Sequence, residues 1–297
     1  MIQLSNGHKL EFLAASGSLA FDGLGWPWEQ PARWLKFWDP SVFTVVLKTL
    51  TFDPRLGNQR WYNPHKVVKW LDGQGHVNSI GLTNMGFMKW CELVAPRLRP
   101  DMKFIVSITG TPTELRLMAG RLNSFDIVAV EINASCPNSP DHSALLSNVQ
   151  LVEESVKVVA EVCRHPIILK LSYQQQYLEI ICSLAHTLAA VSINSVPWGI
   201  VYPGKPSPLP KKFGHGGVSG KVAQQYTWAM IDRLVRDKKV PVIGASVWDY
   251  PDLEILKAKG VGAVAFGSVF IKHRRHVFCP CLPDQYVTRW RREHGEF

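Results

Sequence analysis

The chain has 297 residues, of which 46% are apolar and 19% are charged. This balance provides for a full hydrophobic core and argues against a disordered chain. The formal net charge of +9 favours anionic partners, such as a phosphate cofactor, a carboxylate substrate or a nucleic acid, or serves solubility alone.

Short apolar runs that resemble strands recur along the chain, and most are followed by a helix-like stretch. Many are apolar throughout rather than alternating, as in parallel strands covered on both faces. Strands that alternate with helices indicate βαβ units. The runs are 10–16, 43–50, 77–82, 104–109, 127–134, 167–172, 190–196, 240–246 and 261–269.

This pattern predicts a single α/β domain over residues 1–297, folded as a (β/α)8 TIM barrel, for which about 250 residues are typical. Nine runs are too many for a ring of eight, so we place 77–82 outside the ring. Residues 148–163 and 222–238 have helical spacing. The loop 196–217 carries four prolines between Pro203 and Pro210 and is expected to be an excursion at the rim.

The sequence lacks the patterns of a membrane-spanning, a secreted or a metal-binding protein. No apolar run approaches the roughly 18 residues of a membrane span, and the start of the chain lacks the pattern of a secretory signal. We therefore expect a cytoplasmic protein without a membrane span. The six cysteines form no Cys-x-x-Cys pair, so no metal site is expected.

Polar residues gather where several of the apolar runs end. The run 127–134 leads into Ser135-Cys136-Pro137-Asn138, and in barrels this end of a strand belongs to the catalytic face. Cys136 precedes a proline and should lie on a loop; the alternative is an ordinary buried cysteine. Four strand-end asparagines could pool donors and acceptors for a flat heterocycle, or could simply form turns: Asn78, Asn133, Asn138 and Asn194.

Two lysines and three glycine-rich turns point to an anionic ligand. Lys48 and Lys170 lie inside apolar runs, where lysine is rare without a partner. One such lysine could snorkel to the surface, but two favour a bound anion or an electron-rich ring. The turns 213–220, 244–246 and 266–268 lie late in the chain, where barrels often bind phosphate; each alone could be an ordinary turn.

At these residues the sequence resembles the dihydroorotate dehydrogenase family, from about Leu13 to Phe270. Residues 133–138 look like its Asn-x-Ser-Cys-Pro-Asn signature, and Asn78-Ser79-Ile80-Gly81-Leu82 is similar to its Asn-Ser-Met-Gly-Leu loop. Further pieces follow in family order: Ala15-Ser16-Gly17, Lys48-Thr49, Arg55 with Gly57-Asn58, Lys170-Leu171, Asn194-Ser195 and residues 216–220.

The resemblance implies an FMN-dependent oxidoreductase acting on CH–CH bonds, which oxidises dihydroorotate to orotate in pyrimidine biosynthesis. Cys136 would be the catalytic base, as in the soluble class 1 enzymes, which are expected to be homodimers. The substrate would contact Lys48, Asn78, Gly81, Leu82, Asn133, Asn138, Asn194 and Ser195. FMN would contact Ala15, Ser16, Gly17, Lys48, Thr49, Asn133 and Lys170, with its phosphate at Gly216, Gly217, Gly244, Ala245, Ser246, Gly267 and Ser268.

The sequence departs from the family at a few positions and leaves other functions open. Ala245-Ser246 replaces a usual Gly-Gly pair, and Gln59 stands where proline is usual. The electron acceptor is open between fumarate, NAD through a partner subunit, and a quinone. One alternative is a tRNA-modifying dihydrouridine synthase, although only a short segment follows Phe270 in place of that family's RNA-binding domain. Another is a barrel that binds FMN without turnover.

Overall fold

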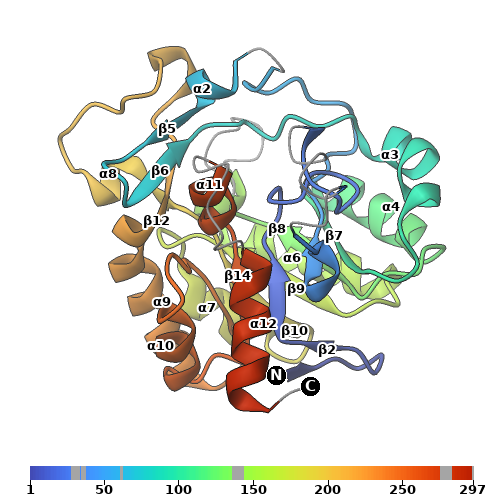
Figure 1. Ribbon diagram of the computed structural model, residues 1–297. Helices are drawn as coiled ribbons and strands as arrows, with labels where there is room; N and C mark the ends of the chain where they lie inside the picture. The colour runs from blue at the N-terminus through green and yellow to red at the C-terminus, as the bar shows by residue number, and fades with distance from the viewer. Residues whose placement is uncertain (28–33, 35–37, 61–62, 136–143, 275–282, 296–297) are drawn as a thin grey trace.

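The computed structural model describes residues 1–27, 34, 38–60, 63–135, 144–274 and 283–295. Within this part of the chain, eight parallel strands form a ring surrounded by helices (Figure 1). The strands are β3 (Phe12–Ala14), β4 (Thr44–Val46), β7 (Lys103–Ile108), β8 (Ala129–Asn133), β9 (Ile167–Leu171), β10 (Leu188–Ile193), β13 (Ile243–Gly244) and β14 (Ala263–Phe266).

The strands follow one another around the ring in chain order. The ladder runs β10-β9-β8-β7-β4-β3-β14-β13, and a parallel bridge between Val191 and Val242 joins its two ends. The prediction of a (β/α)8 barrel is therefore confirmed. Several strands are shorter than the predicted runs. For example, β13 contains only two residues of the predicted run 240–246.

The helices cover the outside of the ring and bury their apolar faces against it. Asn148 accepts a hydrogen bond from the Leu151 N–H at the start of α6, close to the predicted boundary. A 3-10 turn over 221–223 delays the start of α9 relative to the predicted 222–238. The described helices of more than four residues are α3 (Phe87–Leu93), α4 (Pro112–Leu122), α6 (Val149–Val162), α7 (Tyr177–Leu184), α9 (Gln224–Asp237), α10 (Asp252–Ala258), α11 (Ser268–Arg274) and α12 (Pro283–His294).

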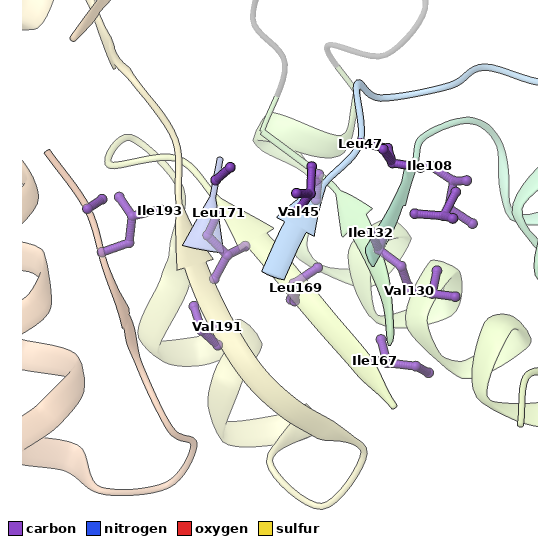
Figure 2. Close-up of a cluster of buried hydrophobic side chains, with 14 of the residues drawn as sticks. Val45, Leu47, Ile108, Val130, Ile132, Ile167, Leu169, Leu171, Val191 and Ile193 are labelled. Carbon is purple, nitrogen blue, oxygen red and sulfur yellow. The ribbon is translucent and has the colours of Figure 1, made fainter. Parts of the chain in front are cut away.

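Because successive side chains of a strand point to opposite faces, the strands contribute to two cores. The larger lies between the ring and the helices and contains Ile132, Leu169 and Val191, as Figure 2 shows. The smaller fills the amino-terminal end of the barrel interior. It contains Leu13, Val46, Ile105, Val128, Ala129, Ile168, Ala190, Ile243 and Ala263, together with Ile2, Leu4 and Leu10 of the first residues of the chain.

The two ends of the barrel are covered differently (Figure 1). The hairpin of β1 (Ile2–Gln3) and β2 (Lys9–Leu10) covers the amino-terminal end. An antiparallel sheet lies at the other end and consists of β11 (Val196–Pro197), β12 (Gly217–Gly220), β6 (Gly75–Asn78) and β5 (Val68–Trp70). The prediction that the run 77–82 lies outside the ring is confirmed, because β6 belongs to this second sheet.

The proline-containing segment 196–217 is more ordered than a simple rim loop. It begins with β11 and α8 (Trp198–Val201) and contains a 3-10 turn over 211–213. Trp198 and Leu209 pack with Val77 and Val218 against the outer face of the second sheet. The segment therefore supports the sheet that covers the carboxyl ends of the ring strands.

Candidate active site

A cavity of 590 Å³ lies between the carboxyl ends of the ring strands and the second sheet. It reaches residues at or just beyond the ends of most ring strands, as expected for the catalytic face of a barrel. Sixteen residues proposed from the sequence line it: Ala15, Ser16, Gly17, Lys48, Thr49, Asn78, Gly81, Leu82, Asn133, Lys170, Asn194, Ser195, Ala245, Ser246, Gly267 and Ser268.

The remaining proposed residues do not line this cavity or cannot be placed. Cys136 and Asn138 lie outside the described residues. Gly217 lies behind the cavity wall, since a Cβ there would come within 2.3 Å of Ser195 Oγ. Gly216 packs against Leu209. Gly244 does not line the cavity either, because a Cβ there would meet Leu256 of α10; its contact with the phosphate stays a prediction.

Two buried lysines lie at the cavity. Lys48 is 7% exposed and Lys170 is 8% exposed. The Lys170 ammonium lies 3.7 Å from a carboxylate oxygen of Glu131, and the Lys48 ammonium lies 5.9 Å from the centre of the Phe21 ring. Lys170 belongs to β9, and Lys48 lies two residues beyond the end of β4, so these two strands place two positive charges next to the cavity.

Hydrogen bonds fix the orientation of the carboxamides. Asn133 Nδ2 donates to Thr49 Oγ1 at 3.1 Å, and its Oδ1 accepts from Ser135 Oγ at 2.7 Å. Asn194 Nδ2 donates to the Ser135 carbonyl at 3.1 Å, and Asn78 Nδ2 donates to the Gly217 carbonyl at 3.4 Å. These amides are therefore held in place before any ligand binds.

The loop that carries Gly81 and Leu82 adopts a left-handed backbone at both residues, with φ of +71° and +58°. For leucine this conformation is unusual. The neighbouring loop holds it: Asn58 Nδ2 donates to the Ser79 carbonyl at 3.0 Å, and Arg55 Nε donates to the Gly81 carbonyl at 3.3 Å. Residues 55–58, which resemble the family in sequence, therefore support the cavity wall.

The Ala245-Ser246 departure has a structural explanation. Ser246 has a φ of +65°, a conformation that glycine adopts without strain. Here α9 holds the serine: Thr227 Oγ1 donates to Ser246 Oγ at 3.0 Å, and Gln224 Nε2 donates to its carbonyl at 3.0 Å. The turn thus keeps the backbone conformation that a glycine pair would allow.

Sequence reasoning missed the inner face of the second sheet. Val68 and Trp70 of β5, His76 of β6 and Ser219 of β12 line the cavity. His76 is 2% exposed, and its ring meets the Trp70 indole edge to face at 6.3 Å. The spacing of two residues between Val68 and Trp70, and between His76 and Asn78, was the available signal.

The described cysteines lie away from the cavity. Cys91 is buried on α3, and this burial raises the pKa of its thiol to about 11. Burial also raises the pKa of Cys163, and Cys182 is exposed on α7. None of these three lines the cavity, so among the cysteines only those outside the described residues remain candidates for a base.

The cavity fits a flavin and a small polar ring. Its volume lies in the range of about 300–1,000 Å³ that is usual for ligand sites. Two ammonium groups, hydroxyls and carboxamides supply donors, and Gln59 Oε1 is a buried acceptor with no hydrogen-bond partner among the described residues. The described residues contain no cluster of histidine, cysteine and carboxylate groups able to hold a metal ion and no helix able to span a membrane.

Comparisons with known proteins find a matching family and several relatives. The family model for dihydroorotate dehydrogenase matches residues 29–276. The catalytic subunit of dihydroorotate dehydrogenase B (NAD(+)) from Carboxydothermus hydrogenoformans is 29% identical, with 77% of this chain and 75% of that protein covered. The subunit of the same name from Desulforudis audaxviator is 30% identical, with 88% and 82% covered. The one from Petrotoga mobilis is 29% identical, with 88% and 84% covered.

Proposed function

Because the chain belongs to the dihydroorotate dehydrogenase family, we propose that it oxidises dihydroorotate to orotate with a bound FMN. The observation that carries this proposal is one cavity, at the carboxyl ends of the barrel strands, that collects Lys48, Lys170 and three of the four strand-end asparagines. Two cations suit an electron-rich ring and a carboxylate, and the amides suit a pyrimidine.

The reaction breaks two C–H bonds on neighbouring ring carbons and forms one C=C bond. One carbon loses a proton and the other loses a hydride. FMN, when bound, accepts the hydride and its two electrons. Cys136, as a thiolate, takes the proton; an unperturbed thiol has a pKa near 8.5, so the thiolate is a minor form at neutral pH.

The residues of the cavity would divide between the two ligands. Lys170, Thr49 and residues 15–17 would hold the flavin ring, with Ala245, Ser246, Gly267 and Ser268 at the phosphate. The amides of Asn133 and Asn194 at the cavity, and that of Asn138, which follows β8 in the sequence, would hold the pyrimidine. Lys48, Asn78, Gly81, Leu82 and Ser195 would complete the substrate site.

The names of the relatives favour one route for the electrons. Those compared above are catalytic subunits of NAD(+) enzymes. We therefore propose that a partner subunit passes electrons from this chain to NAD+, with fumarate and a quinone as the competing acceptors. The chain would act as a single barrel domain in a cytoplasmic homodimer.

Anaerobic mixing with dihydroorotate tests the proposal. The purified protein should carry one FMN per chain, and its flavin absorbance should bleach when dihydroorotate is added. Fumarate and a quinone, added in turn, then test direct reoxidation of the flavin; by the proposed route NAD+ should reoxidise it only when the partner subunit is also present. A colourless protein that takes up no FMN on reconstitution contradicts the cofactor. A yellow protein that dihydroorotate does not bleach favours a flavin barrel without this activity, and salt-dependent binding of tRNA favours a dihydrouridine synthase.

A further inference from the structure

A buried carboxylate lies inside the barrel, beneath the cavity, and the proposed reaction does not use it. Glu131 on β8 is 3% exposed. Its Oε1 accepts from Ser107 Oγ at 2.9 Å, and its Oε2 accepts from Ser192 Oγ at 3.0 Å. The Lys170 ammonium lies 3.7 Å from Oε1. One acidic side chain thus joins β7, β8, β9 and β10 in the interior.

The carboxylate fixes the direction of the hydrogen bonds that lead to the cavity. A carboxylate can only accept, so the single Ser107 hydroxyl hydrogen is donated to Glu131. In the 2.9 Å contact between Thr49 Oγ1 and Ser107 Oγ, Thr49 is then the donor. Ser16 Oγ, 3.1 Å from Thr49 Oγ1, is a second hydroxyl next to Thr49 and donates to the Leu47 carbonyl. Thr49 is left with lone pairs toward Asn133, which matches the 3.1 Å bond donated by Asn133 Nδ2. The chain of bonds from Glu131 therefore supports the amide orientation at the cavity.

The same carboxylate also offsets the charge of Lys170. Both groups are almost fully buried, and charges interact more strongly there than in water. A buried ion pair adds little stability by itself, so its retention in the interior calls for another role. A negative charge 3.7 Å behind Lys170 reduces the positive potential that this lysine presents to the cavity.

From these contacts we infer that Glu131 is a positioning residue with two separable effects, an inference that rests on the proposed function. Its negative charge reduces the positive potential that Lys170 presents to the cavity, and so helps to set the reduction potential of the bound flavin. Its acceptor oxygen, acting through Ser107 and Thr49, sets the amide of Asn133 and so the affinity for orotate. Glu131 itself does not line the cavity.

Glu131→Gln tests the charge. Its amide oxygen can take the place of Oε1, where Ser107 and Lys170 lie, so the bonds toward Asn133 are kept. With the negative charge removed, Lys170 should favour the reduced flavin about tenfold more, which is about 30 mV for a two-electron couple. Orotate affinity should stay within about twofold, as for a bond whose partners are kept. The measurements are the equilibrium midpoint potential and a titration with orotate.

Ser107→Ala tests the chain of hydrogen bonds. Thr49 loses the nearer of its two neighbouring hydroxyls and keeps only Ser16 Oγ at 3.1 Å, so Ser107 no longer directs the Thr49 hydroxyl hydrogen away from the Asn133 amide. Orotate affinity should fall by roughly tenfold, as for the loss of one or two net hydrogen bonds, while the midpoint potential stays at the wild-type value. Thr49 and Asn133 are unchanged in this variant, so the loss is attributable to the orientation of the amide.

Matched variants separate these effects from net charge and from packing. Glu11 pairs with Lys257 at 3.6 Å at the other end of the barrel, so Glu11→Gln changes the net charge equally and should leave the potential unchanged. Glu131→Asp keeps the charge and should keep the wild-type potential, even where its shorter side chain lowers the Tm.

The outcomes decide between the inference and the proposed function. A Glu131→Gln protein with unchanged or lowered potential, or a rise that Glu131→Asp shares, overturns the charge effect. Unchanged orotate affinity in Ser107→Ala overturns the orientation effect. If Glu131→Gln does not fold, the orotate titration of Ser107→Ala alone decides whether the inference stands. A wild-type protein that binds no FMN overturns the proposed function and this inference with it. If the wild type binds FMN but the variants keep its midpoint potential and orotate affinity, only this inference is overturned.

Discussion

The barrel interior has an amino-terminal end, covered by the β1–β2 hairpin and here called the closed end, and a carboxyl-terminal end at the cavity, here called the open end. The same strands build both ends, and within two residues of a strand the side chains change from apolar to polar. On β9, Ile168 packs in the apolar cluster at the closed end, and Lys170 lines the cavity. On β7, Ile105 is followed in the same way by Ser107. The pleat of a strand sends residues i and i+2 to the same face, so both belong to the interior.

The difference shows how the fold separates stability from chemistry. The closed end buries a cluster of apolar side chains, which contributes about 25 cal/mol per Å² of buried apolar surface, and the hairpin β1–β2 shields it. The open end buries a carboxylate, two lysines and several hydroxyls, which contribute little net stability but hold donors in fixed directions. Substitutions at the closed end should therefore lower the free energy of unfolding, and substitutions at the open end should change ligand binding or reaction rate.

The largest expected effect concerns Cys136, which follows β8 in the sequence and is the proposed base. In Cys136→Ser, flavin reduction by dihydroorotate should slow about 10²–10⁴-fold, the usual contribution of a general base. A hydroxyl is a far weaker acid than a thiol, so it is rarely ionised. Stopped-flow absorbance measures the rate, and orotate binding should persist because the side-chain volume hardly changes.

The pH profile is the control for this assignment. In the wild type, reduction should accelerate as the pH rises through the thiol pKa, and this rise should be absent in Cys136→Ala. If Cys136→Ala reduces its flavin within a fewfold of the wild-type rate, the cysteine is structural. A different residue at the open end would then have to act as the base.

At the closed end, Ile105→Ala should lower the free energy of unfolding by about 2–5 kcal/mol, as for other large-to-small changes in a core. Ile105 is fully buried in the smaller core. FMN affinity of the folded protein should stay unchanged. Urea unfolding and FMN titration measure the two quantities. A loss of FMN affinity comparable to that of an open-end variant would show that the two ends are coupled.

Lys170→Ala tests the open end by binding rather than by rate. A hydrogen bond to a charged group contributes about 1.5–3 kcal/mol, so FMN affinity should fall roughly tenfold to a hundredfold. Lys257→Ala is the matched control, since Lys257 also pairs with a carboxylate, Glu11, at the closed end. Equal FMN dissociation constants for the wild type and Lys170→Ala would rule out this lysine as a flavin contact.

The sequence predicted the ring well because buried parallel strands leave continuous apolar runs, and it predicted much of the cavity lining because motifs at strand ends meet at one face. It missed Trp70 and His76, since β5 and β6 are short and their partner β12 lies far along the chain. The burial of Glu131 could not be predicted either, because an acidic residue within an apolar run does not reveal that it faces the barrel interior. A glycine motif also does not reveal which face of a strand meets the cavity, and a Cβ on Gly244 would face Leu256 of α10.

The smallest effect concerns a polar residue at the open end that serves structure alone. Thr111 Oγ1 accepts from the Glu114 N–H at 3.3 Å, and Glu114 Oε2 accepts from the Thr111 N–H at 2.7 Å, a capping box at the start of α4. Neither residue lines the cavity. Thr111→Ala should lower the free energy of unfolding by about 1 kcal/mol, measured by urea unfolding. Thr111→Ser, which keeps the hydroxyl, should restore most of it. FMN affinity and reduction rate should match the wild type in both variants; a change in either would mean that the α4 cap also shapes the site, and that polar groups at this end cannot be divided into structural and functional sets.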